Sequence, residues 1–204
     1  DIVSDRFRAI LGAKVEHNDF TGVEFQPNAR LLWALNDRQT VWAATSRAVR
    51  TPSRAEDGLR SVIGMVPASL LPEGAPPTFL VVRGSHSFKS ETVHALELGY
   101  RLLNPGRYTI DVTSFYNRYG DLRDVGLDPS VAAATATQAT LPFVLNNTAD
   151  GRTFGFEAAA DLELARWWRL HATYAFLDVK LDSSPGGSGN PSDLAENGQP
   201  DHQL

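Results

Sequence analysis

The sequence predicts an all-β protein: an antiparallel, up-and-down segment of a transmembrane β-barrel with about seven long strands. Two observations predict this class. The first is a strict alternation of apolar and polar residues that lasts through stretches longer than ordinary globular strands. The second is the regular exchange of tight turns and long connections between these stretches. Together they predict short turns in the periplasm and long extracellular loops.

The clearest alternation lies in Thr153–Leu164. Every second residue, from Phe154 to Leu164, is Phe, Ala or Leu, whereas the opposite set contains Glu157, Asp161 and Glu163. Successive strand residues point to opposite faces, so one face is apolar and the other is charged. Charged residues disfavour a dry core on their side, and the length suits a tilted strand that crosses a bilayer.

Six further stretches are predicted as strands. The third of them, Gln39–Val49, alternates poorly because its alanines suit either face, so the directions of Arg47 and Arg50 stay open. The six stretches are Phe7–His17, Phe25–Leu35, Gln39–Val49, Thr92–Leu103, Arg107–Tyr119 and Arg169–Lys180.

The connections fall into two classes. Tight turns are expected at Asn36–Arg38, Asn104–Gly106 and Ala165–Trp168, and a modest loop at Asn18–Glu24. Long connections are expected at Thr51–Glu91, Gly120–Asp150 and Leu181–Leu204. Inside them we expect local structure: a strand at Phe79–Arg83, a helical turn within Ser61–Leu71, and a strand at Leu141–Asn147, whereas Val131–Thr140 is ambiguous between strand and helix.

Aromatic residues gather near both ends of the predicted strands. Such residues prefer the membrane–water interface, so we interpret them as two belts around an aliphatic band. The alternative is that aromatics simply favour strand ends and cores. The belt near the tight turns would comprise Trp33, Trp42, Tyr100, Tyr108, Trp167 and Trp168.

Composition argues against several other classes of protein. The 204 residues carry a net charge of −5 and no Cys, so neither a nucleic-acid-binding surface nor a disulfide framework is expected. We expect residues 1–204 to be part of one outer-membrane β-barrel domain, with a plug domain and the remaining strands absent.

Several segments resemble TonB-dependent outer-membrane receptors. They are Val41–Ser53, Glu91–Arg101, Tyr108–Arg123, the pair Asn146-Asn147 and Gly151–Glu157, in the order of that family. The resemblance implies uptake of a scarce ligand such as a ferric siderophore, cobalamin or a glycan, at the bacterial outer membrane. It implies contact with outer-membrane lipid, and with TonB through a plug domain outside this chain. It implies neither an enzyme nor a cofactor.

Two other functions fit the pattern less well. One is a soluble β-rich module, such as a carbohydrate-binding or adhesin domain, and the other is a passive porin or an autotransporter barrel. A soluble module has no reason to separate short and long connections, and small soluble barrels fill their interior with apolar side chains.

Candidate residues belong to two sets, and neither includes a catalytic or metal-binding residue. Cations and tyrosines at the long-loop ends are the candidates for contact with an anionic or aromatic ligand: Arg50, Arg54, Arg83, His86, Tyr116 and Tyr119. The polar sides of the strands are expected to face the lumen: Glu97, Arg101, Asp111, Glu157, Asp161 and His171.

Overall fold

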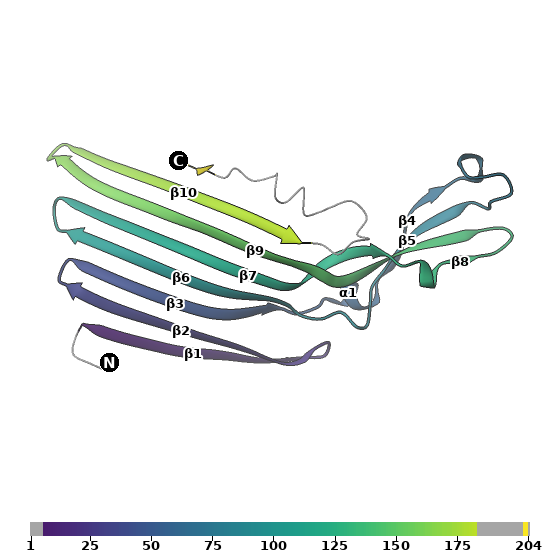
Figure 1. Ribbon diagram of the computed structural model, residues 1–204, viewed down its shortest axis with the longest axis horizontal. Coiled ribbons are helices and arrows are strands. Elements are labelled where there is room, and N and C mark those ends of the chain that lie inside the picture. The colour runs from purple at the N-terminus through teal and green to yellow at the C-terminus, as the bar shows by residue number, and fades with distance from the viewer. Residues whose placement is uncertain (1–5, 183–201, 204) are drawn as a thin grey trace.

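The computed structural model describes residues 6–182 and 202–203, and its main feature is one curved sheet (Figure 1). Its long strands run side by side in the order β1-β2-β3-β6-β7-β9-β10, and each pairs antiparallel with the next. The predicted all-β, up-and-down arrangement of long strands is therefore confirmed. The strands are β1 Phe7–Asn18, β2 Gly22–Asn36, β3 Gln39–Arg50, β6 Glu91–Asn104, β7 Tyr108–Leu127, β9 Ala139–Ala165 and β10 Trp168–Asp182.

The predicted tight turns all lie at one end of this sheet. They connect β2 to β3, β6 to β7 and β9 to β10, at the left in Figure 1. At the other end, β1 and β2 meet in a short turn at residues 19–21, where Asn18 accepts hydrogen bonds from the Phe20 and Thr21 N–H groups. The modest loop that we expected there is shorter than predicted, because the Asn18 side chain closes the hairpin locally.

The prediction of a long loop at Gly120–Asp150 was wrong for most of its length. β7 continues to Leu127 and β9 begins at Ala139, so these two strands extend together beyond the rest of the sheet (Figure 1). Their register shifts between Tyr119 and Asp124, and Asp121 adopts a positive φ of 53°. These irregularities interrupt the period-two pattern that reveals a strand. The predicted strand at Leu141–Asn147 is confirmed as the first part of β9.

A small second group of elements, which we call the outer module, lies beside this extension (Figure 1). It contains α1 (Arg54–Gly58), β4 (Arg60–Val66), η1 (Ala68–Leu70), β5 (Thr78–Arg83), η2 (Pro129–Val131) and β8 (Ala133–Ala134). The predicted strand at Phe79–Arg83 is confirmed, whereas the helical turn expected within Ser61–Leu71 is only the short η1, because most of that segment is β4. β5 pairs in parallel with the start of β9, and Val81 on β5, Leu145 on β9 and Phe88 between β5 and β6 are all buried.

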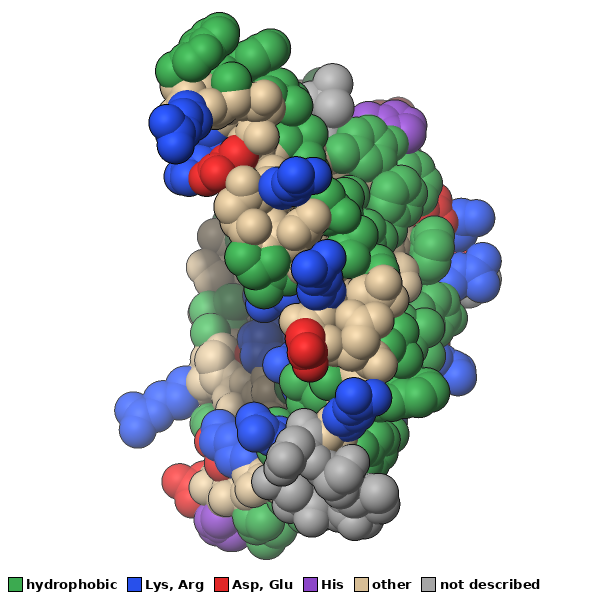
Figure 2. Space-filling view, turned by 90° about the vertical axis from the view of Figure 1, so that its left-hand side faces the viewer, with side chains coloured by type: hydrophobic (Ala, Val, Ile, Leu, Met, Phe, Trp, Pro, Cys, Tyr) green, Lys and Arg blue, Asp and Glu red, His purple; other side chains and the backbone are tan. Residues whose placement is uncertain are grey.

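The long strands, in contrast, bury almost no apolar side chains. Cross-strand partners share a face, and one face carries Leu11, Leu31, Leu96, Phe154 and Leu170, all of them exposed. Leu11, for example, is 80% exposed. In Figure 2, which looks at the end with the short turns, hydrophobic side chains cover the convex right-hand side and charged side chains lie in the hollow on the left. The sheet thus presents an apolar face that no other part of the described chain covers.

The chain end returns to the sheet. Leu181 and Asp182, which we had assigned to the final loop, belong to β10, and β11 (His202–Gln203) pairs with Ala175 and Phe176 of β10. The rest of the predicted third long loop lies outside the described residues. The helices among residues 6–182 and 202–203 are all too short and too polar to span a bilayer.

Candidate functional site

The concave face of the sheet carries paired charges. Arg101 donates from Nε to Asp111 at 2.6 Å, and the His171 ring lies 3.0 Å from an Asp161 oxygen. Arg169 donates to Glu163 at 2.5 Å, and Arg30 lies 3.9 Å from Glu97. The first three pairs join neighbouring strands, and the Arg30–Glu97 pair reaches across β3 from β2 to β6, so the charges reinforce the wall while they remain solvated.

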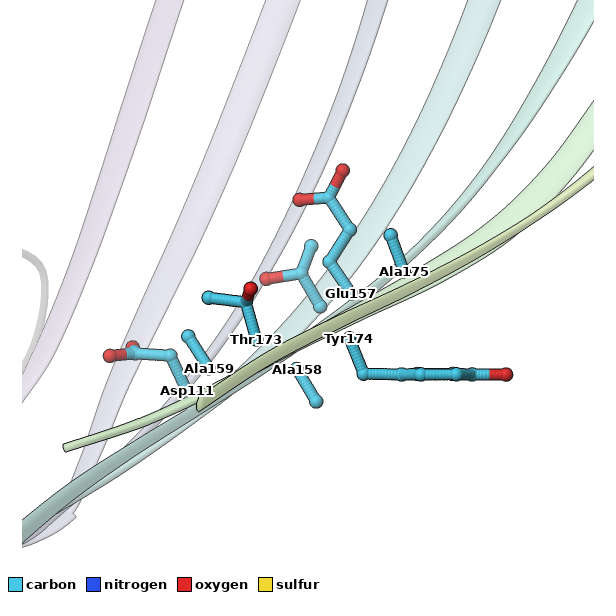
Figure 3. A pocket seen from close by; sticks show the side chains of 8 residues that line it. Asp111, Glu157, Ala158, Ala159, Thr173, Tyr174 and Ala175 are labelled. Atoms are coloured by element: carbon cyan, nitrogen blue, oxygen red, sulfur yellow. The ribbon is translucent and has the colours of Figure 1, made fainter. Parts of the chain in front are cut away.

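All six residues expected to line the lumen lie on this one face. Arg101 is opposite Asp111, Asp111 is opposite Ala159, and Asp161 is opposite His171. Glu157 and Glu97 follow at even spacing on the same strands. Figure 3 shows Asp111 and Glu157 pointing toward the strands across the hollow, whereas Tyr174 points away. The geometry brings these residues together on the concave face; that this face is the lumen of a closed barrel remains our proposal.

A shallow hollow of ≈ 290 Å³ lies on this face (Figure 3). Asp111, Thr113, Glu157 and Thr173 supply its polar groups, from β7, β9 and β10. Two carboxylates and two hydroxyls favour hydrogen-bond donors or cations. Among the described residues, no group of three or more His, Asp or Glu side chains is placed to hold a metal ion.

Trp42 corrects one of the predicted aromatic belts. It pairs with Leu32 and Gly99, which places it on the concave face and not among the residues of the apolar face. Its ring covers Gly99 so closely that a Cβ there would overlap it. The Arg30 guanidinium lies over the ring, 4.8 Å from its centre. The pattern failed here because the alternation of this strand is weak, and because only a glycine opposite lets the ring lie flat.

A cluster of charges ties the outer module to the sheet. Arg50, at the end of β3, donates from Nε to Glu91 at 2.6 Å and from a terminal nitrogen to Glu56 at 2.7 Å. The Arg123 backbone N–H donates to Glu91 at 2.8 Å, and the Arg123 side chain forms an ion pair with Glu56 at 3.6 Å. We call these four residues the junction cluster. It joins β3, β6, β7 and α1 at the point where the outer module begins.

The short helix α1 is built to place Glu56 in this cluster. Ser53 is its N-cap: its side chain accepts from the Glu56 N–H, and the Glu56 side chain accepts from the Ser53 N–H at 2.8 Å. The Glu56 side chain is only 4% exposed. Burial by itself raises the pKa of Glu56, but the hydrogen bonds from Arg50 and Ser53 outweigh this effect and hold the pKa below its ordinary value.

The six residues expected to contact a ligand do not meet at one point. Arg50 is held by two carboxylates, Arg54 is exposed on α1, and Arg83 lies at the end of β5. His86 is exposed, with its ring 2.9 Å from Asp57. Tyr116 pairs with Leu96 and Phe154 on the apolar face, whereas Tyr119 lies on the opposite, concave face.

Sequence reasoning missed three members of the junction cluster and one cation of the outer module. Glu56 had a readable signal, because Ser53 followed three residues later by Glu is a capping box. Glu91 and Arg123 had none, since their meeting depends on the register of β6 and β7. Arg60, which lies directly opposite Arg83, was hidden by the mistaken helical turn.

Comparison with known proteins agrees with this geometry. A family model described as "TonB dependent receptor-like, beta-barrel" matches residues 1–204. Comparison with curated proteins finds no match. Among solved structures, a variant of the ferric enterobactin receptor PfeA from Pseudomonas aeruginosa, in complex with enterobactin, superimposes with a TM-score of 0.73 at 21% identity. That match covers 87% of this chain and 25% of the receptor.

Two further structures are similar. The siderophore receptor PirA from Pseudomonas aeruginosa gives a TM-score of 0.66 at 17% identity, over 88% of this chain and 33% of that one. The copper transporter OprC gives 0.55 at 17% identity, over 87% and 28%. The chain therefore spans about a quarter to a third of the length of these structures. Since the family model covers the chain from end to end, the chain belongs to the TonB-dependent receptor-like β-barrel family.

Proposed function

We propose that this chain forms part of the wall of an outer-membrane receptor that takes up a scarce small ligand, with ferric siderophores as the leading class, and that it carries out no catalysis. One observation carries the proposal. In a chain that the family model matches from end to end, the sheet has an exposed apolar face and a charged concave face, and a folded outer module lies at the end opposite the short turns. A soluble binding module would cover its apolar face.

The partners follow from the same arrangement. The apolar face suits the hydrocarbon of the outer membrane, and the concave face suits a solvated lumen. Coupling to TonB would pass through a plug domain supplied by another part of the protein. The siderophore receptors among the similar structures support an iron-complex ligand, and enterobactin is the ligand named for one of them.

The outer module offers cations to an anionic iron complex. Arg60 and Arg83 lie directly opposite each other on β4 and β5, and neither forms an ion pair within the described residues. Like charges at opposite positions of a sheet destabilise it, which favours an external anion between them. Arg54 is exposed in the same module, and His86, which follows β5, is exposed beside Asp57 of α1. We propose Arg54, Arg60, Arg83 and His86 as ligand contacts, together with Tyr119 at the long-loop end of the concave face. Arg50 acts instead through the junction cluster.

The test uses the intact receptor in its host under iron limitation, with ferric enterobactin as the probe. We expect deletion of the gene to abolish uptake of radiolabelled iron from this complex, and complementation to restore it only when TonB is present. Unchanged uptake of ferric enterobactin and of other ferric siderophores after the deletion would contradict the siderophore proposal. Uptake that persists without TonB would indicate a passive barrel.

A double variant tests the contacts themselves. We expect Arg60→Gln with Arg83→Gln to weaken ferric enterobactin binding about tenfold, because two charge-assisted contacts are lost. Its folding should be unharmed, since the variant removes a repulsion. Arg38→Gln with Arg107→Gln makes the same change in net charge at the short-turn end, where both residues are exposed, and is expected to bind normally. Equal affinity in both variants would remove this pair from the ligand site.

A further inference from the structure

A row of basic residues crosses the apolar face near its outer end. His94 on β6 pairs with Arg118 on β7, Arg118 pairs with Arg152 on β9, and Arg152 pairs with Lys180 on β10. Because cross-strand partners share a face, these four side chains project from the same side as Leu96, Tyr116 and Phe154. We call them the basic row.

The basic row lies at a definite height. On β7 it is ten residues from Tyr108 at the short-turn end, and on β9 it is ten residues from Leu162. At about 3.3 Å per residue and a tilt of about 40°, ten residues rise by roughly 25 Å, which is the height of the apolar band of outer-membrane barrels. Tyr116 and Phe154 lie one position inward on the same face, as an interfacial aromatic belt would. The row is thus placed where outer-leaflet headgroups begin.

The charges of the basic row are also accessible to an external ligand. All four side chains are exposed, and in the part of the chain that the structure describes neither Arg118, Arg152 nor Lys180 forms a side-chain hydrogen bond or ion pair. The basic residues of the concave face differ, since Arg101 and Arg169 are each paired with a carboxylate. Arg47 continues the row on β3, but it donates to the Phe25 carbonyl and lies near Glu24, so it is already engaged.

A groove of ≈ 650 Å³ lies beside the row on the same face. His94 and Arg118 form its basic side, Leu96 and Tyr116 its apolar side, and Thr45 and Thr92 add hydroxyls. From the apolar band outward, the groove is lined by Leu96 and Tyr116, then by His94 and Arg118, and then by Thr92 and Asp150. Cations placed just outward of an apolar surface suit an anionic lipid, whose headgroup lies outward of its acyl chains.

We propose that the basic row and this groove bind the phosphate of an anionic lipid headgroup in the outer leaflet, with Arg118 and Arg152 as the principal contacts. Arginine offers paired N–H donors that match a phosphate group. The inference rests on the proposed outer-membrane location. It concerns the lipid-facing side of the wall and not the ligand that the receptor takes up.

Carboxylates border the row and set its selectivity. Asp150 lines the groove, Asp182 is opposite Asp150, and Asp178 is opposite Phe154. They repel a phosphate at the flanks and restrict it to the line of cations. Replacing Asp150 with Asn is therefore expected to tighten lipid binding.

The experiment uses the full-length receptor in an uncharged detergent, with phosphatidylglycerol and phosphatidylcholine as probes and native mass spectrometry to count bound lipid. We expect the parent protein to retain phosphatidylglycerol in preference to phosphatidylcholine. Arg118→Gln with Arg152→Gln and Lys180→Gln is expected to lose about tenfold or more of that preference. The matched control, Arg38→Gln with Arg107→Gln and Arg166→Gln, removes three exposed cations at the short-turn end and is expected to keep it.

The proposal is overturned if the triple variant keeps its preference, or if the control loses it equally. Complete release of phosphatidylglycerol by millimolar inorganic phosphate would also overturn it, because the site would then select free phosphate and not a lipid. Heat resistance of the folded barrel in electrophoresis confirms that each variant folds. Ferric enterobactin binding, measured on the same samples, separates a failure of this proposal from a failure of the proposed uptake function.

Discussion

Two neighbouring alanines on β9 face different environments. Ala160 lies opposite Ile110 and Ala172 on the apolar face, whereas Ala159 lies opposite Asp111 and Thr173 on the concave face. We expect Ala160→Arg to lower the free energy of unfolding by about 2–4 kcal/mol, because a lipid-facing cation near the midplane is poorly solvated. Ala159→Arg gains Asp111 as a neighbour and should cost much less. Refolding titrations of both variants in lipid vesicles measure this, and equal costs would contradict the assignment of the faces.

Gly99 is a second position where one added side-chain atom is expected to change the stability of the fold. Its missing side chain makes room for the Trp42 ring, which in turn supports Arg30. Gly99→Ala is expected to displace the ring and cost about 1–3 kcal/mol of stability through overpacking. Gly64→Ala on β4 is the control, because its new Cβ would meet Leu80 at an ordinary 3.5 Å. If both substitutions have the same small effect on the unfolding midpoint, the ring does not depend on this glycine.

At the scale of elements, the junction cluster holds the outer module to the sheet. Glu56→Gln keeps the shape of the side chain and its acceptor for the Ser53 N–H, but it loses the ion pairs with Arg50 and Arg123. We expect opening of residues 54–66 to become easier by about 1–3 kcal/mol, with no change in β9 and β10. Hydrogen exchange of the intact receptor resolves the two regions. Equal acceleration in both would show that the cluster stabilises the whole sheet.

Low pH is expected to weaken the junction cluster as well. The pKa of Glu56 is lower in the folded state than in the unfolded chain, so its carboxylate contributes stability that is complete above the ordinary pKa of a glutamate. That contribution is lost as the pH falls through the folded value. Hydrogen exchange in α1 and β4 should therefore accelerate in this acid range, and less so in Glu56→Gln. An identical pH dependence in the variant would assign the acid effect to other groups.

The elements themselves were largely predictable from the sequence. Alternation located the long strands because one of their faces is apolar and the other charged. It failed beyond Tyr119, where bulges shift the register, and at Arg60–Val66, whose run of small and apolar residues has no period. The parallel pairing of β5 with β9 joins segments about sixty residues apart, and no local pattern reports it.

The candidate site was less predictable than the strands. The face of Glu157, Asp161 and their neighbours followed from the alternation alone. The junction cluster did not, because Arg50, Glu91 and Arg123 meet only once the register of three strands is known. The basic row required the same information across β6, β7, β9 and β10. Local pattern therefore indicates which way a side chain points, and register decides which side chains meet.

At the scale of the whole molecule, the sheet is open. Among the described residues β1 pairs only with β2, and β10 pairs with β9 and the two-residue β11 (Figure 1). Unpaired edges of this length favour further strand pairing, so we expect them to join other strands of a closed barrel. The apolar convex face then meets lipid, and the concave face meets water.

Accessibility along β9 distinguishes a lipid-facing side of the sheet from a water-facing one. The sequence contains no Cys, so single Cys substitutions from Phe154 to Leu162 in the intact receptor can each carry a spin label in this segment. In lipid vesicles, collision rates with oxygen should peak at the even positions, whose side chains share the face of Phe154 and Leu162. Collision rates with a water-soluble nickel complex should peak at the odd positions, which share the face of Glu157 and Asp161. The absence of this two-residue alternation, or access of the nickel complex to both faces, would contradict a membrane-spanning wall.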